Sequence, residues 1–345
     1  MSRRSTPAAL VALLLALSAC GAGSGDDRAP GRPEAGRGAQ SRPAPGPNPL
    51  AGRTFYVDPA NTASEQAGYW ERENRAADAR ELRKIGDRPV AHWLTGGTDA
   101  SAAVDALVGA AAARRQLPVL VAYNIPNRDC GSFSSGGAAS PEAYRAWLRS
   151  IVTGLKQRPA VVIVEPDAVP HVVDGCGGQE AERYALLAEA VTTLKASPGA
   201  VVYLDAGHPA WVGDTRMLAD ALTQAGVDEA DGFSLNVSNF IRTEENLAYG
   251  AKLSDALRGR RFVVDTSRNG AGPVTGGTEI NGGPSWCNPP DRKLGPAPTT
   301  DTGHPRADAF LWIKRPGESD GACRPGEPPA GKWWPEYALD IAKRS

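Results

Sequence analysis

The chain has 345 residues, of which 41% are hydrophobic, so it can bury a sizeable core and is not a disordered protein. Its 38 basic and 39 acidic residues leave a formal net charge of -1, which gives no electrostatic reason to expect nucleic acid as a partner. We therefore expect a neutral ligand. Eight Trp and eight Tyr suit flat surfaces on which sugar rings stack, although ordinary core aromatics explain the same count.

The first residues are typical of an export signal. Arg3 and Arg4 precede an apolar run from Ala8 to Leu17, which is too short to span a bilayer but has the length of a signal-peptide core. The run continues into Leu17 to Cys20, which is similar to a bacterial lipobox, where the chain is cut before the cysteine and its thiol is lipidated. A plain secretory signal that happens to carry a cysteine is the alternative. We predict a signal peptide over residues 1–20 and a protein that is either secreted or anchored to the outer face of the cell membrane.

Composition predicts two further regions. Residues 21–51 consist mainly of Gly, Ala, Pro, Arg, Asp and Ser, so they cannot bury a core and are expected to form a flexible tether. A single folded domain is expected over residues 52–345. Outside the signal the chain has an even number of cysteines, which suits two disulfides in an oxidising compartment: Cys130, Cys176, Cys287 and Cys323.

Short β-rich runs alternate with Ala-rich amphipathic segments along this domain. The predicted strands are residues 54–57, 90–94, 119–125, 160–164, 200–204, 232–237, 261–264 and 309–313. The predicted helices are residues 101–116, 141–157, 180–196, 215–225 and 244–257. Several strands are apolar throughout, as in a parallel sheet covered by helices. We predict a single (β/α) barrel with about seven to eight parallel strands and a cleft at their carboxyl ends. An open doubly wound sheet is the alternative, but no nucleotide-binding GxGxxG or GxxxxGK[ST] motif follows an early strand.

Four aspartates follow predicted strands: Asp129, Asp167, Asp205 and Asp265. One such Asp is more often a helix cap or a turn residue, but four in succession indicate a site at the carboxyl face of the barrel. Clustered carboxylates raise one another's pKa, so that one of them can hold a proton near neutral pH. Cleavage of a glycosidic bond needs such an acid together with a second carboxylate.

Two other chemistries have weaker support. His171, His208 and His304 fall near the same strand ends and loops, but no HxH, HExxH or paired Cys/His spacing is present, so we expect no metal and no cofactor. A serine nucleophile would need a GxSxG turn after a strand, and none occurs.

Seven ordered blocks, spread over nearly all of residues 52–345, resemble glycoside hydrolase family 6. They are VAYNIPNRDC (121–130), VVIVEPDAV (161–169), LDAGHPAW (204–211), NVSNF (236–240), DTSRNG (265–270), WCNP (286–289) and FLWIKRPGESDG (310–321). The resemblance implies a distorted, incompletely closed β/α barrel that hydrolyses β-1,4-glucosidic bonds with inversion. It also implies two disulfides, Cys130–Cys176 and Cys287–Cys323.

The same resemblance implies a role for individual residues. Asp167 would be the general acid, Asp129 would raise its pKa and help to position water, and Asp265 would be the base, although the motifs leave the choice of base between Asp129 and Asp265 open. Tyr123 and Ser135 would distort the sugar and hold water. The residues that would bind glucose units are Trp93, Asp205, His208, Trp211, Asn239, Trp286, Lys314 and Glu318. Thr95 stands where many relatives carry Asp.

The connections around the expected cleft are short, since only nine residues separate Cys130 from Ser140. Family members that work from chain ends roof the cleft with long loops, so we predict an endoglucanase that cuts inside β-1,4-glucan chains. A cellobiohydrolase of the same family is the first alternative. A surface protein that binds glucan without cutting it is the alternative from another class, but the aspartates argue against it. We expect a monomer that contacts the membrane only through a lipid anchor.

Overall fold

The computed structural model describes residues 46–97, 99–176 and 179–345. The predicted signal peptide, the candidate lipidation site Cys20 and most of the predicted tether lie outside these residues. Within them, no helix combines the length and hydropathy that a bilayer-spanning segment needs. Leu50, two residues before the expected start of the domain, is fully buried, and Asn48 Nδ2 donates a hydrogen bond to Asp308 O at 2.9 Å.

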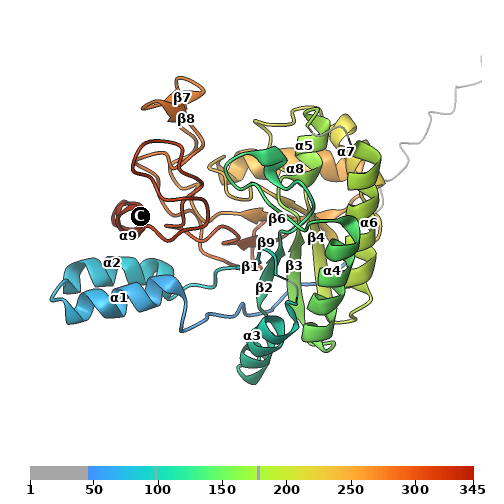
Figure 1. Cartoon of the computed structure of the whole chain (residues 1–345). Helices are drawn as coiled ribbons and strands as arrows, with labels where there is room; N and C mark the ends of the chain where they lie inside the picture. The colour runs from blue at the N-terminus through green and yellow to red at the C-terminus, as the bar shows by residue number, and fades with distance from the viewer. Residues whose placement is uncertain (1–45, 98, 177–178) are drawn as a thin grey trace, which may run out of the picture. The chain divides into compact units, whose positions relative to one another are not determined.

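Seven parallel strands form one sheet in the order β1-β2-β3-β4-β5-β6-β9 (Figure 1). Their bounds are β1 His92–Leu94, β2 Val119–Ala122, β3 Ala160–Val164, β4 Ala200–Asp205, β5 Gly232–Leu235, β6 Arg261–Asp265 and β9 Ala307–Leu311. In the described part of the chain no ladder joins β1 to β9, so the barrel is incompletely closed. The two edges are linked instead by Ala91 N, which donates to Trp312 O at 2.9 Å, and by Trp93 Nε1, which donates to Ile313 O at 2.8 Å. The predicted distorted barrel is confirmed.

Helices cover the outside of the sheet, and further helices precede its first strand and follow its last strand along the chain (Figure 1). They are α1 Thr62–Arg72, α2 Ala76–Gly86, α3 Ser101–Ala113, α4 Pro141–Leu155, α5 Ala168–Val173, α6 Glu180–Lys195, α7 Thr215–Gln224, α8 Thr243–Ala256 and α9 Pro335–Lys343. All five predicted helices are present within a few residues of their expected bounds. Four others, α1, α2, α5 and α9, were not predicted. The strand expected at 54–57 is a single bridge between Phe55 and Leu117.

The strands are buried on both faces, which explains their continuous apolar sequence. In β3, Val162 and Val164 pack in the cluster beneath the surrounding helices, whereas Val161 and Ile163 pack in the cluster inside the barrel. This alternation follows from the period of two along a strand. The barrel interior is therefore filled with side chains, and any ligand has to bind above the strands rather than inside them.

Both expected disulfides are present. Cys130 bonds to Cys176 with a Cα–Cα distance of 6.2 Å, and Cys287 bonds to Cys323 with a Cα–Cα distance of 6.4 Å. The first joins the segment after β2 to the segment after α5, and the second ties the long 270–305 connection to the segment after β9. The disulfide pairing that the family resemblance implied is confirmed.

Removing the second disulfide tests its contribution to stability. We expect Cys287→Ser combined with Cys323→Ser to lower the free energy of unfolding by about 2–4 kcal/mol, because the reduced chain gains loop entropy when it unfolds. The bridge closes a sequence separation of 36 residues, and Cys287 is fully buried. Urea unfolding of both proteins under oxidising conditions measures the difference. Equal midpoints and slopes would show that the disulfide adds nothing to the stability of this fold.

Candidate active site

A cleft of about 1020 Å³ lies where the strands end. Eleven of the residues expected at the site line it: Trp93, Tyr123, Asp129, Ser135, Asp167, His208, Trp211, Asn239, Trp286, Lys314 and Glu318. They come from segments that follow different strands, and the parallel sheet brings these segments to one end of the barrel. Two expected residues, Asp205 and Asp265, do not line the cleft.

Asp167 lies at the edge of the cleft, at the N-cap of α5, with a left-handed backbone (φ 71°). Its backbone N donates to Asp205 Oδ2 at 2.9 Å, which fixes the start of the helix. Burial, followed by the negative charges of Asp205 and Asp129, raises the pKa of the Asp167 carboxyl well above its usual value. The raised pKa favours the protonated form of Asp167, which is the form that a general acid needs.

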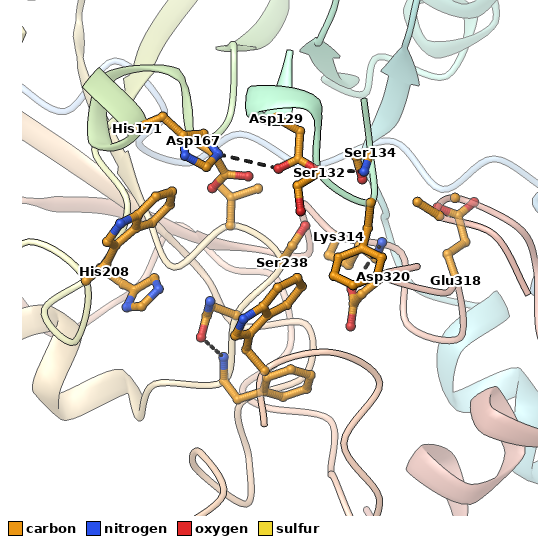
Figure 2. A pocket seen from close by; sticks show the side chains of 18 of the residues that line it. Asp129, Ser132, Ser134, Asp167, His171, His208, Ser238, Lys314, Glu318 and Asp320 are labelled. Carbon is orange, nitrogen blue, oxygen red and sulfur yellow. Dashed lines mark hydrogen bonds and ion pairs between the residues drawn. The ribbon is translucent and has the colours of Figure 1, made fainter. Parts of the chain in front are cut away.

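Asp129 faces Asp167 across the upper part of the cleft (Figure 2). It begins the short 3-10 turn Asp129–Gly131, and its Oδ2 accepts a hydrogen bond from Ser134 N at 2.5 Å. Its Oδ1 lies 3.4 Å from His171 Nε2. One ligand atom each of Asp129, Asp167 and His171 lies within 4.8 Å of the others. The negative charge of Asp129 is thus close enough to oppose ionisation of Asp167.

The loop that carries Asp129 turns back at Gly137, where only glycine fits. The backbone there has φ 102°, and a Cβ atom would lie 1.9 Å from Ile125 O. The turn returns the chain to the end of β2, with Ala138 N donating to Asn124 O at 2.9 Å. Ser135 and the neighbouring Ser132 and Ser134 are held over the cleft by this return.

Asp205 is fully buried behind Asp167 and has no access to a sugar. Its carboxylate accepts hydrogen bonds from Asp167 N at 2.9 Å, Gly207 N at 3.1 Å and Ser234 Oγ at 2.9 Å. Burial raises the pKa of Asp205 to about 6 despite these donors. The expected contact of Asp205 with glucose hydroxyls does not fit this position. Asp205 is placed to hold Asp167 and to raise its pKa.

Asp265 is also fully buried, below the floor of the cleft. Its two oxygens accept four backbone N–H groups at 2.9–3.2 Å, those of Ser238, Ser267, Ile313 and Lys314. The carboxylate therefore ties together the segments that follow β5, β6 and β9. This position does not favour the expected role of Asp265 as the base, because the carboxylate is separated from the cleft and its hydrogen-bonding capacity is already used.

Asp320 lines the cleft and had no assigned role in the sequence analysis. Burial raises its pKa, but the positive charges of Arg268 and Lys314 outweigh burial and hold the pKa below its usual value. Arg268 Nη2 lies 2.9 Å and Lys314 Nζ lies 3.4 Å from Asp320 Oδ1. Asp320 is therefore held in its ionised form, whereas the surroundings of Asp167 favour its protonated form. Asp320 lies in the block at 310–321 that resembles family 6, and Arg268 lies in the block at 265–270. These blocks are the sequence signal that could have identified Asp320.

Aromatic side chains line the walls of the cleft. Trp93 packs edge-on against Tyr123 with ring centroids 5.2 Å apart, and Trp211 packs against His171 at 4.8 Å. Trp286 is 44% exposed and contacts Phe133, a residue that the sequence analysis did not select, at 5.8 Å. Exposed indole faces along a cleft are suited to stacking on sugar rings.

Glu165, two residues before Asp167, is a buried carboxyl that joins two site loops. Its oxygens accept from Asn124 N and Ile125 N at 3.0 Å and from Tyr144 Oη at 2.9 Å. Burial raises its pKa from 4.5 to about 7. The folded state therefore binds a proton that the unfolded chain releases. The contribution of this proton to the free energy of unfolding is fully present below about pH 4.5 and falls as the pH rises toward 7.

This titration gives a prediction for Glu165→Gln. The Gln oxygen can accept from both amides while its NH2 group donates to Tyr144, so the fold keeps its contacts and loses a titrating group. We expect the unfolding free energy of the variant to depend less on pH between about 4.5 and 7, where a single group contributes up to about 1.4 kcal/mol per pH unit. Urea unfolding across this range measures the slope, and identical slopes for both proteins would contradict the assignment.

Three groups of side chains in the described residues have the proximity that a metal ion requires. Two of them contain disulfide cysteines, Cys130–Cys176 with His171 and Cys287–Cys323 with Glu327, and these sulfurs are not available as thiolate ligands. The third consists of Asp129, Asp167 and His171, at the centre of the cleft.

An incompletely closed parallel barrel, with two carboxyl groups whose pKa values are shifted in opposite directions in one aromatic-lined cleft, defines a glycoside hydrolase. The sequence profile of glycosyl hydrolases family 6 matches residues 50–345, and the chain belongs to this family.

Several characterised relatives match over most of the chain. Endoglucanase A of Cellulomonas fimi is 43% identical over 305 residues, which cover 87% of this chain and 62% of that protein. Endoglucanase 1 of Streptomyces halstedii is 44% identical over 83% of this chain and 88% of its own length. The endoglucanase Cel6 of Mycobacterium tuberculosis, solved in complex with methyl-cellobiosyl-4-deoxy-4-thio-beta-D-cellobioside, superposes with a TM-score of 0.80 and 45% identity over 86% of this chain and 99% of that one.

Proposed function

We propose that this chain is a cellulase that hydrolyses internal β-1,4-glucosidic bonds with inversion. The observation that carries the proposal is the position of Asp167, whose pKa is raised by burial and by neighbouring carboxylates, in a cleft lined by Trp93, Trp211 and Trp286. The printed names of the relatives, endoglucanases of Cellulomonas fimi and Streptomyces halstedii, support the same activity. So does the thio-linked cello-oligosaccharide in the complex of the Mycobacterium tuberculosis enzyme.

Asp167 would protonate the leaving oxygen, and a second carboxylate would accept a proton from the attacking water. In inverting enzymes the two carboxyl groups are about 6.5–9.5 Å apart, to leave room for that water. Asp129 has an oxygen within 4.8 Å of Asp167, closer than this range, so its position suits raising the pKa of the acid and holding water. We propose Asp320 as the base, acting directly or through one water, because it lines the cleft and is held ionised by Arg268 and Lys314.

One short connection beside the cleft supports endo action. The segment from Cys130 to the start of α4 at Pro141 carries only the serine-rich turn and closes back on β2. A cleft that remains accessible along its length binds the middle of a chain, whereas a roofed cleft requires a chain end. A cellobiohydrolase of the same family and a non-catalytic glucan-binding protein are the alternatives.

Carboxymethylcellulose and cello-oligosaccharides distinguish these functions. We expect the viscosity of carboxymethylcellulose to fall long before many reducing ends appear, and the first products of cellohexaose to be α-anomers by NMR. Cellobiose as the dominant early product, with little loss of viscosity, would identify a cellobiohydrolase. Retained binding without any cleavage would identify a glucan-binding protein. β-Anomers as first products would contradict inversion.

We also propose that the chain is exported, is anchored through a lipid on Cys20 and acts as a monomer. The apolar run from Ala8 to Leu17, the lipobox-like sequence and the two disulfides support export to an oxidising compartment. In a host that processes bacterial lipoproteins, labelled palmitate should enter the wild type but not Cys20→Ser. An unlabelled protein in the medium would identify plain secretion.

A further inference from the structure

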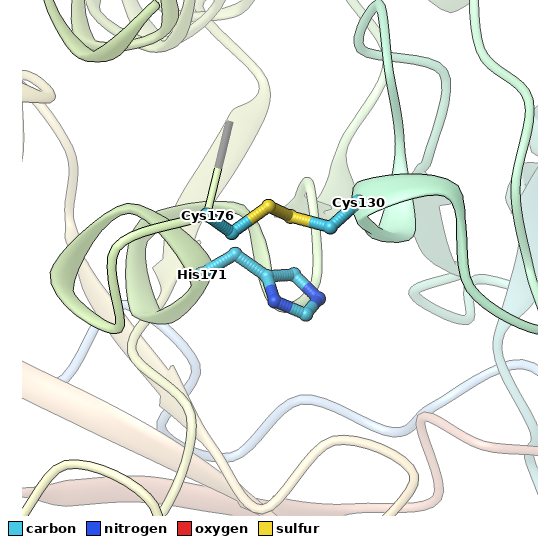
Figure 3. A group of neighbouring side chains, drawn as sticks. All are labelled: Cys130, His171 and Cys176. Atoms are coloured by element: carbon cyan, nitrogen blue, oxygen red, sulfur yellow. A yellow bond between two sulfur atoms is a disulfide. The ribbon is translucent and has the colours of Figure 1, made fainter. Parts of the chain in front are cut away.

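His171 is a cleft residue that the proposed hydrolytic mechanism does not use. It lies in α5 four residues after Asp167, one helical turn along, so both side chains lie on the same side of the helix. Its Nε2 is buried and has no hydrogen-bond partner among the described residues, although Asp129 Oδ1 is 3.4 Å away. The disulfide Cys130–Cys176 joins the two segments that carry Asp129 and His171, next to the imidazole ring (Figure 3).

The distances within this group match those of a small divalent ion. Zinc binds imidazole nitrogen and carboxylate oxygen at about 2.0–2.2 Å, so two tetrahedral ligands are roughly 3.4 Å apart. The separation of Asp129 Oδ1 and His171 Nε2 is 3.4 Å. Asp167 also offers a ligand oxygen within 4.8 Å of a ligand atom of each of the other two residues. The cleft gives water access to a fourth position.

The chemistry of the three side chains is also selective. A neutral imidazole and two carboxylates balance the charge of a divalent cation. Imidazole suits zinc and copper, whereas calcium and magnesium prefer oxygen ligands alone.

We propose that Asp129, Asp167 and His171 form an inhibitory site for a divalent transition-metal ion such as Zn²⁺. The inhibitory effect rests on the proposed function, in which Asp167 delivers a proton to the leaving oxygen. A bound ion would occupy the Asp167 carboxyl oxygen that has to reach the leaving oxygen of the substrate, so the metal and the reaction compete for the same atom. Metal binding and acid catalysis therefore exclude each other, and the ion is an inhibitor rather than a cofactor.

Direct binding tests the site without reference to activity. Zn²⁺ is titrated by calorimetry into the metal-free protein and into His171→Asn and His304→Asn. Asn can replace the Nδ1 position of either histidine but not Nε2. His304 does not line the cleft, and its Nδ1 accepts backbone N–H groups of Arg306 and Ala307 at 3.2 Å, which an Asn oxygen can also accept.

We expect one Zn²⁺ per wild-type chain and per His304→Asn chain, and at least about 10-fold weaker binding by His171→Asn, a loss that even an outer-shell partner can cause. Equal affinity in all three proteins would overturn the site. In a second experiment, Co²⁺ serves as the probe. The same d–d absorption band in wild type, His304→Asn and His171→Asn would overturn the site as well.

Inhibition is measured separately, as the ratio of carboxymethylcellulose cleavage with and without Zn²⁺, with recovery after EDTA. We expect the half-inhibitory concentration to increase at least about 10-fold in His171→Asn, in parallel with the binding constant. Tight binding with undiminished cleavage would overturn the inhibitory role and keep the site. If the wild type cleaves no glucan, the proposed function fails, and the titrations still decide whether the metal site exists.

Discussion

Asp167→Asn is expected to lower kcat on carboxymethylcellulose by about 10²–10⁴-fold, because the amide cannot protonate the leaving oxygen. The pKa of Asp167 is raised by burial and by its neighbours Asp205 and Asp129, which favours the protonated form that the reaction needs. Initial rates of reducing-end release at saturating substrate measure the loss. Asp301→Asn, at an exposed position outside the cleft, is the matched control and should retain wild-type activity.

A second substrate separates acid catalysis from binding. In an aryl cello-oligosaccharide whose phenol is a strong acid, the phenolate leaves without being protonated. Asp167→Asn should therefore cleave this substrate with a much smaller defect than it shows on glucan. An equal defect on both substrates would mean that Asp167 acts in some other way. Affinity for cello-oligosaccharides, measured by calorimetry, should change little, because the substitution keeps the shape of the side chain.

Asp320→Asn and Asp265→Asn are expected to differ in which property they damage. Asp320 is the ionised carboxylate in the cleft, so its variant should lose about 10²–10⁴-fold in kcat. The Asp265 carboxylate accepts four backbone N–H groups below the cleft. In Asp265→Asn the NH2 group of the new amide would face backbone N–H donors, which it cannot accept. Its variant should therefore lose stability, on the order of 1–3 kcal/mol for a buried donor left unsatisfied.

Thermal unfolding and single-turnover kinetics on both variants distinguish the two roles. A stable, inactive Asp265→Asn together with a fully active Asp320→Asn would return the role of base to Asp265. Azide, a small anion able to occupy the place of a lost carboxylate, should restore part of the activity of Asp320→Asn and none of that of Asp265→Asn.

The sequence predicts the barrel well because buried parallel strands leave a direct signal. Segments such as Ala160–Val164 are apolar at every position, since one face packs against helices and the other fills the barrel. The helices α1 and α2 were missed because their sequences are rich in charged residues, and the apolar positions that pack against α9 are few. The two helices pack mainly against each other and in part against α9 near the other end of the chain, and only a few positions in each helix are buried.

The structure places most of the expected site residues in the cleft, but it buries Asp205 and Asp265 away from it. Asp205 and Asp265 are the last residues of β4 and β6, where the side chain is still enclosed by neighbouring strands. Asp129 and Asp167 follow their strands by several residues and reach the cleft. The aspartates were selected by their position at a strand end, and this criterion does not distinguish a buried aspartate from one that reaches the cleft. The ionised state of Asp320 arises from Arg268 and Lys314, which come from separate blocks and meet only in the fold.

Asp129 and Asp167 both have a left-handed backbone, with φ values of 54° and 71°. This conformation makes the enzyme less stable than it would be with an ordinary backbone at these positions. Such conformations cost of order 1–3 kcal/mol for a residue other than glycine, and Asn tolerates them better than most residues. The inactive variant Asp167→Asn should therefore unfold at a higher temperature than the wild type, which would mean that the active cleft is kept at the expense of thermal stability.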